Sequence, residues 1–254
     1  MRRILVAALA VCLLLLPHAA LCRDLLVATF DNPPLEFYDD DSARGVNVDI
    51  ARECLQRMGY GMIVIFVPWS RALKMVRTGE VDAILDAGWT AERSKYLHFS
   101  DEGIYREEIF AFKLRERALT LSAGFEGAGK YLVGVGRGTS YGLEVDKAIL
   151  SGRLVVESVT EIDNNIQKLL RGRIDMFFAD RLGAEHALQR MGLTGSIHIV
   201  RQAGSNMEYS LGFSTTYMAF SSRAFDPEIA RRFSMVLRGL KADGTVQRIA
   251  DSYN

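Results

Sequence analysis

Short apolar runs and segments of helical periodicity alternate along the chain beyond residue 22. An apolar run of four to eight residues favours a buried strand, and apolar residues at every third or fourth position favour an amphipathic helix. We therefore expect strands at 25–30, 62–67 and 81–85, separated by helices at 47–58 and 70–77. Strands that alternate with helices are typical of a mostly parallel sheet covered by helices, so the expected fold class is α/β.

The same alternation begins again near residue 132. We expect strands at 132–135, 154–157 and 174–178, and helices at 140–150, 160–171 and 181–191. Asn47 and Thr160 stand at the starts of two helices and are expected as N-caps, the second in a capping box with Asp163. Two rounds of one pattern predict two α/β lobes.

A five-residue echo links the two rounds. Residues 78–82 read Thr-Gly-Glu-Val-Asp and residues 171–175 read Arg-Gly-Arg-Ile-Asp, and each precedes a predicted strand. These strands lead to an acid, Asp86 or Asp180, near the carboxyl edge where open parallel sheets bind ligands. Two such edges facing each other would enclose a cleft, although helix–Gly–strand is also common in α/β proteins generally.

The start of the chain predicts export. Arg2 and Arg3 precede an apolar run at 4–16 that is too short to span a bilayer, and Ala20 and Cys22 fit a cleavage site after Cys22. We expect residues 1–22 to be a signal peptide and the mature protein to be soluble and periplasmic. Lipid attachment at Cys22 is the lesser alternative, because Leu21 is large where a lipoprotein signal usually has a small residue.

Composition excludes several classes of function. The formal net charge of the whole chain is zero, and no basic excess points to a nucleic-acid partner. Cys54 is the one cysteine beyond the predicted signal, so no internal disulfide is expected, and its apolar helical face predicts a core position. The histidines lack the spacing of metal ligands. We expect no metal, no cofactor and a monomer.

Residues 86–100 carry the most informative local pattern. An apolar run at 83–85 leads through a short loop to Thr90-Ala91-Glu92-Arg93. Thr90 can cap a helix from whose first turn Arg93 projects, and free backbone N–H groups beside a guanidinium make an anion site. The fork of a guanidinium suits a carboxylate in two-point geometry. On this segment alone, a solvated arginine in a capping turn explains the pattern as well.

This segment resembles the T-x-x-R carboxylate-binding segment of bacterial extracellular solute-binding proteins of family 3. Further resemblances follow in the family's order at residues 33–37 (PPLEF), 45–50 (GVNVDI), 136–140 (GRGTS), 179–180 (AD) and 241–245 (KADGT). They cover nearly the whole mature chain. The resemblance implies a type II periplasmic-binding-protein fold, a Venus flytrap of two α/β lobes joined by two crossover strands. Lobe 1 would comprise 23–107 and 214–254, and lobe 2 would comprise 108–213.

The resemblance also implies ligand-binding residues. Arg93 would take a carboxylate from lobe 1, while Ser140, with Thr139 in the same loop, would add a hydroxyl and a backbone N–H from lobe 2. Asp180 would take the ammonium of an α-amino acid. Ser140 and Asp180 are equally placed to cap the helices that follow them. Contacts from both lobes to one ligand would favour closure of the cleft.

Departures from the family pattern bear on the ligand. Asn32 replaces an aromatic residue before the Pro-Pro turn, and Gly88 replaces a serine or threonine, offering backbone only. Asp86 stands where a small residue is common and could pair with Arg71 or with a cationic ligand side chain. For Trp69, core packing and stacking on the ligand both remain open.

The function that the resemblance implies is capture of a small α-amino acid or related carboxylate, without catalysis, for the membrane subunits of an ABC-type importer. Residues 68–72 (PWSRA) resemble a subgroup whose members often lack a transporter assignment. One alternative is therefore a periplasmic enzyme similar to cyclohexadienyl dehydratases, with Glu36 or Asp86 as its acid. The other is a sensory receptor that presents its ligand to a separate membrane protein.

Overall fold

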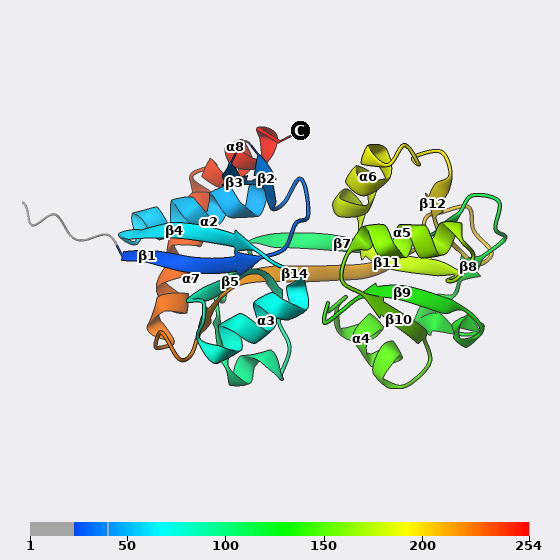
Figure 1. Ribbon diagram of the computed structural model, residues 1–254, viewed down its shortest axis with the longest axis horizontal. Helices are drawn as coiled ribbons and strands as arrows, with labels where there is room; N and C mark the ends of the chain where they lie inside the picture. The colour runs from blue at the N-terminus through cyan, green and yellow to red at the C-terminus, as the bar shows by residue number, and fades with distance from the viewer. Residues whose placement is uncertain (1–22, 40, 254) are drawn as a thin grey trace, which may run out of the picture.

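The computed structural model describes residues 23–39 and 41–253, so the predicted signal peptide at 1–22 lies outside the described residues. Two α/β halves lie side by side, and strands β7 (Tyr105–Leu114) and β14 (Ser210–Ser221) run through both (Figure 1). The ten-stranded sheet has the order β10-β9-β11-β7-β14-β5-β1-β4, with β12 paired to β7 and β6 to β14. Within the described ranges, no helix is long and apolar enough to cross a membrane.

The described part of the first half contains three parallel strands and four helices. The strands are β1 (Arg23–Thr29), β4 (Tyr60–Phe66) and β5 (Ala83–Gly88), with the short β6 (Leu97–Phe99) and a hairpin of β2 (Phe37–Asp39) and β3 (Ser42–Arg44). The helices are α2 (Val46–Arg57), α3 (Trp69–Thr78), α7 (Glu228–Ala242) and α8 (Thr245–Asp251). Alternate residues of β1 and β5 face opposite sides of the sheet, so α2 and α7 cover one side and α3 the other.

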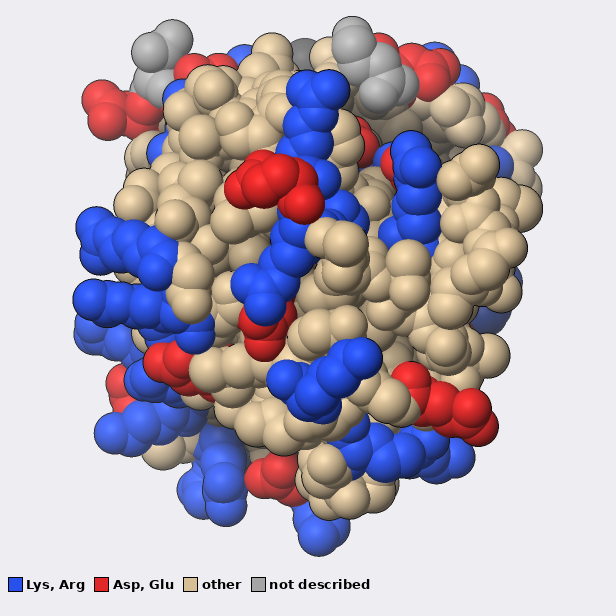
Figure 2. Space-filling model, turned by 90° about the vertical axis from the view of Figure 1, so that its right-hand side faces the viewer, with Lys and Arg blue, Asp and Glu red and all other residues tan. Residues whose placement is uncertain are grey.

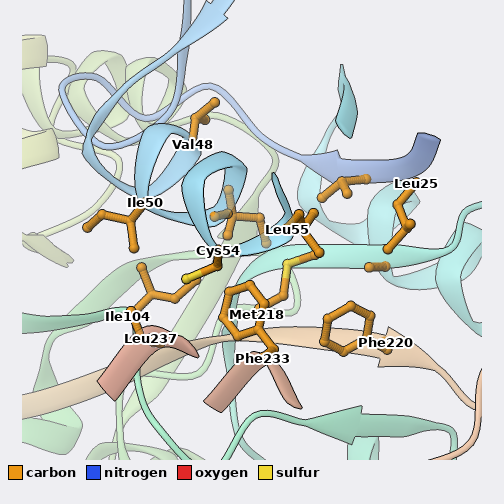
Figure 3. Close-up of a cluster of buried hydrophobic side chains, with 14 of the residues drawn as sticks. Leu25, Val48, Ile50, Cys54, Leu55, Ile104, Met218, Phe220, Phe233 and Leu237 are labelled. Carbon is orange, nitrogen blue, oxygen red and sulfur yellow. The ribbon is translucent and has the colours of Figure 1, made fainter. Parts of the chain in front are cut away.

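A large apolar cluster anchors this half. Cys54 and Leu55 of α2 lie with Met218 and Phe220 of β14 and Phe233 of α7, all fully buried (Figure 3). Burial of each large side chain contributes about 1.5–3 kcal/mol. The core position predicted for Cys54 is confirmed, and burial raises the pKa of its thiol to about 12.

The second half repeats the arrangement. Its parallel strands are β9 (Leu132–Gly136), β10 (Val155–Val159) and β11 (Met176–Asp180), with β11 antiparallel to β7. Its helices are α4 (Leu143–Leu150), α5 (Ile162–Leu170) and α6 (Arg181–Arg190), and its small strands are β8 (Thr120–Leu121), β12 (Ile197–Ile199) and β13 (Arg201–Gln202). Single 3₁₀ turns lie at η2 (Ala123–Phe125) and η3 (Ala128–Lys130).

The five-residue echo has a structural counterpart. Before β5, the Asp82 carboxylate accepts a hydrogen bond from the Leu26 backbone N–H at 3.0 Å. Before β11, the Asp175 carboxylate accepts one from the Leu132 backbone N–H at 2.6 Å. Each aspartate therefore holds the entry of a strand against its neighbour at the matching place in the two halves.

Two predicted helix caps are wrong. Gly45, with φ 123°, precedes α2, and a side chain there would meet the Leu35 carbonyl oxygen at 2.2 Å. Asn47 lies inside the helix, because its amide is committed to buried carboxylates. Helix α5 begins at Ile162 after Glu161 and has no side-chain cap, so the capping box of Thr160 and Asp163 does not form.

Candidate functional site

A cleft lies between the two halves, at the carboxyl ends of their strands. Its volume is about 110 Å³, on a measure by which one water needs about 10–15 Å³. It therefore has room for a solute of roughly seven to eleven non-hydrogen atoms. All seven residues predicted from the sequence line it, namely Trp69, Asp86, Gly88, Arg93, Thr139, Ser140 and Asp180.

The segment before Arg93 forms a tighter turn than predicted. The Thr90 hydroxyl accepts a hydrogen bond from the Arg93 backbone N–H at 3.1 Å, as a cap does. A single 3₁₀ turn, η1 (Arg93–Lys95), follows in place of an α-helix, because the chain enters strand β6 at Leu97. The turn directs the Arg93 side chain into the cleft.

The Arg93 guanidinium is buried without a carboxylate partner among the described residues. Its side chain donates to the Gly88 carbonyl at 2.6 Å and to the Gly138 carbonyl, and it lies 5.5 Å from the Trp69 ring centroid. The residue is 6% exposed, and burial lowers its pKa. An arginine stays charged in proteins and carries five N–H donors, so part of the fork remains available to an anion in the cleft.

Trp69 is buried in the core and also lines the cleft, and its stacking on a solute stays a prediction. Its ring is buried and packs edge-on against Phe30 with centroids 5.5 Å apart. Its indole N–H donates to the Gly138 carbonyl of the second half at 3.0 Å. Because Arg93 donates to the same oxygen, two side chains of the first half hold one loop of the second. The structure therefore shows the cleft with its two halves in contact.

The loop at 136–142 forms the opposite wall. Ser140 lies three residues before α4 and is not its N-cap, because its hydroxyl donates to Asp146. The Tyr141 backbone N–H donates to the same carboxylate at 2.9 Å. Thr139 lies exposed beside Ser140. A side chain at Gly88 would come within 3.4 Å of the Ser140 side chain, so the glycine lets this loop approach.

Asp180 caps α6 and also lines the cleft. One of its carboxylate oxygens accepts a hydrogen bond from the Gly183 backbone N–H at 2.7 Å. Burial raises its pKa, and that bond partly offsets the rise. The predicted cap is confirmed. Hydrogen bonding from the Asn32 side chain of the first half also lowers the pKa of Asp180, so a solute's ammonium would share the carboxylate with this amide and with the cap.

Asp86 belongs to a buried acidic network. The Asn47 amide donates to Asp86 at 3.2 Å and also to Glu36, which is fully buried behind it. Asp86 adopts φ 64° within β5, in the left-handed region that side chains rarely occupy. Burial raises its pKa to about 7, although the nearby Thr216 hydroxyl lowers it. Arg71 makes no ion pair with it.

Several cleft residues were not predicted from the sequence. Glu107 enters from β7, Thr216 from β14, Asn165 from α5, and Phe30 follows β1. The alternation of Glu107 with Ile109 along an apolar strand could have placed the acid on an inward face. In the part of the chain that is described, no three His, Cys, Asp or Glu side chains are arranged to hold a metal ion.

The fold and the cleft define a two-lobed binding protein of the periplasmic class. An ancestral arginine-binding protein bound to arginine superposes with a TM-score of 0.73 at 20% identity, covering 91% of this chain and 97% of that one. Holo ArgBP from T. maritima gives 0.69 at 22%, covering 86% and 90%. A histidine kinase sensor domain gives 0.75 at 19%, covering 92% and 96%, so this fold serves more than one kind of protein.

The chain belongs to the bacterial extracellular solute-binding proteins, family 3, whose family model matches residues 25–254. The L-cystine-binding protein TcyA of Bacillus subtilis (strain 168) is 20% identical over 222 residues, which is 87% of this chain and 76% of that protein. The predicted family and fold class are confirmed.

Proposed function

We propose that the protein is a periplasmic receptor that captures a small α-amino acid, or a closely related carboxylate, and passes it to an ABC-type importer. The separation of charge in the cleft carries this proposal. Arg93 is a buried cation without an anionic partner among the described residues, and Asp180 is a cleft carboxylate without a cation. An α-amino acid presents the two complementary charges at a fixed separation. Burying either charge of the solute without its partner costs roughly several kcal/mol.

The relatives support the choice of ligand class. The Bacillus subtilis relative is named for cystine, and similar structures include an ancestral arginine-binding protein bound to arginine and one bound to glutamine. These are all amino acids. The predicted signal peptide at 1–22 supports a periplasmic location, and the exported protein is expected to begin at Arg23. The mass of the exported protein tests this, since an acylated species that retains Cys22 would establish lipid attachment.

Closure follows from where the contacts lie. The Gly138 carbonyl already joins the halves through Trp69 and Arg93. A solute whose carboxylate meets Arg93 and whose ammonium meets Asp180 adds contacts to both halves at once. Such a solute stabilises the closed arrangement by the difference between its binding free energies for the closed and the open arrangements.

Binding without catalysis is the favoured role. The raised pKa of Asp86 suits a general acid. However, burial causes most of the rise, and the neighbouring acids add to it. Glu36 is fully buried and does not line the cleft. Mass spectrometry of the solute after prolonged incubation should recover it unchanged, whereas turnover to a new product would make the protein an enzyme.

A thermal-shift screen tests the proposal. The common L-amino acids would be compared with their deaminated acids and decarboxylated amines. A ligand at a hundredfold excess over its Kd stabilises the folded protein by about 2.7 kcal/mol. We expect at least one α-amino acid to reach this effect and both of its truncated analogues to fall short. If either analogue stabilises the protein as much as the intact amino acid does, the two-charge site is wrong.

A further inference from the structure

Acidic side chains converge on the cleft from three separate elements. Asp86 stands on β5, Glu107 on β7 and Asp180 at the end of β11, and Glu36 lies directly behind Asp86. The carboxyls are close enough to affect one another. After burial, the neighbouring carboxylates are the next largest cause that raises the pKa of Glu107, and the same holds for Glu36.

Among the described residues, no lysine, arginine or histidine forms an ion pair with this group. Arg93, the buried cation of the cleft, is turned to the carbonyls of Gly88 and Gly138. The lysines and arginines that Figure 2 shows lie on the outer surface of the second half.

A second feature also points to a ligand at this place. Thr216 lines the cleft from β14 and is only 3% exposed. Its hydroxyl lies near Asp86, and hydrogen bonding between the two lowers the pKa of that carboxyl, but the pair falls outside ordinary hydrogen-bond distance and angle, and the hydroxyl has no other partner among the described residues. A buried hydroxyl without a partner costs free energy unless something in the cleft supplies one.

One ammonium group cannot pair with all three acids that line the cleft, Asp86, Glu107 and Asp180. If Asp180 pairs with the α-ammonium, Asp86 and Glu107 still face the cleft as two carboxyls without a cation. A metal ion does not explain them, because the described acids do not form a ligand set. The cleft volume of about 110 Å³ fits an amino acid whose side chain carries its own cation, such as L-lysine with ten non-hydrogen atoms, by the same allowance of about 10–15 Å³ per water.

We infer that Asp86 and Glu107, with the Thr216 hydroxyl, form a second cation subsite, and that the solute is an α-amino acid with a basic side chain. This inference rests on the proposed function, since it takes the carboxylate at Arg93 as given. The subsite selects by charge. A neutral side chain of the same length would leave two carboxyls facing apolar atoms, whereas a basic one neutralises them.

Calorimetry with a matched pair of solutes tests the subsite. L-lysine and L-norleucine have side chains of similar length, and only lysine carries the second cation. We expect L-lysine to bind at least a hundredfold more tightly. Glu107→Gln should weaken L-lysine at least tenfold and change L-norleucine less than threefold. Glu108→Gln is the control, because successive residues of β7 face opposite sides, and it should leave both affinities unchanged.

The outcomes separate this inference from the proposal beneath it. Binding of L-norleucine as tight as that of L-lysine overturns the second subsite and leaves the amino-acid receptor intact. Equal losses for the two solutes in Glu107→Gln, with an unchanged melting temperature, overturn it as well. If cadaverine, which lacks the carboxylate, binds as tightly as L-lysine, the acidic wall stands and the role proposed for Arg93 fails.

Discussion

Replacing Arg93 with alanine removes the cation that we assign to the solute's carboxylate. In the closed cleft, that substitution leaves a carboxylate buried without a partner, which costs about 3–5 kcal/mol. At 1.4 kcal/mol for each tenfold change, affinity should fall roughly a hundredfold to several thousandfold. The same substitution removes a buried, unpaired charge from the free protein. Folding stability should therefore change little, because the relief from burying that charge offsets the loss of its two hydrogen bonds to carbonyl oxygens.

Titration calorimetry on the wild type and Arg93→Ala, with the L-amino acid selected by thermal shift, measures this loss. Arg71→Ala is the matched control, since Arg71 is exposed on α3 and does not line the cleft. The carboxamide of the same amino acid completes a double-mutant cycle. The wild type should discriminate strongly between acid and amide, and the variant should not. Wild-type affinity in Arg93→Ala, or discrimination that survives the substitution, would refute the assignment.

Three other substitutions probe the rest of the site. Asp180→Asn keeps a good N-cap for α6. It should weaken binding of the α-amino acid by about 2–4 kcal/mol and change the affinity for its deaminated analogue less than threefold. Equal losses for the two solutes in calorimetry would mean that Asp180 acts only as a cap. The pKa of Asp86, about 7 against an ordinary 3.8, makes the folded form bind the proton more tightly than the unfolded form. Folding stability is therefore lost as pH rises from about 4 to about 7. In chemical denaturation, Asp86→Asn should raise the free energy of unfolding by about 1–3 kcal/mol at pH 8 and by little at pH 4. The same gain at both pH values would contradict a buried charge on Asp86. Gly183→Ala brings a methyl group within 2.2 Å of the Asn32 side chain across the cleft and within 2.9 Å of the Asp180 carboxylate that caps α6. It should reduce affinity severalfold, and Asn32→Ala should restore part of the loss; no loss would mean that both side chains move aside freely.

The regular elements were largely predictable from the sequence because their signals are local. Strand β9 begins at Leu132 as expected, and α6 begins at Arg181 behind its Asp180 cap. The start of α2 was not predictable from local signals. Asn47 looks like a cap in the sequence, but the acids that hold its amide come from elsewhere in the chain, 11 and 39 residues away.

In the candidate site, too, residues with local sequence signals were predictable and residues placed by the sheet register were not. Arg93 was found because its turn and its Thr90 cap lie within four residues of each other. Glu107 was missed because its relevance depends on where β7 crosses the sheet, opposite Ser214 of β14. Its neighbour Glu108 has the same chemistry and does not line the cleft. A sequence shows which acids are present, whereas the sheet register decides which of them share one wall.

A crystal structure of the protein grown with the α-amino acid that stabilises it most is the direct test of the two-charge site. We expect carboxylate oxygens within about 3 Å of the Arg93 guanidinium nitrogens. We also expect the ammonium to lie against the Asp180 carboxylate. A solute bound outside the cleft, or one whose carboxylate points away from Arg93, would contradict the two-charge site.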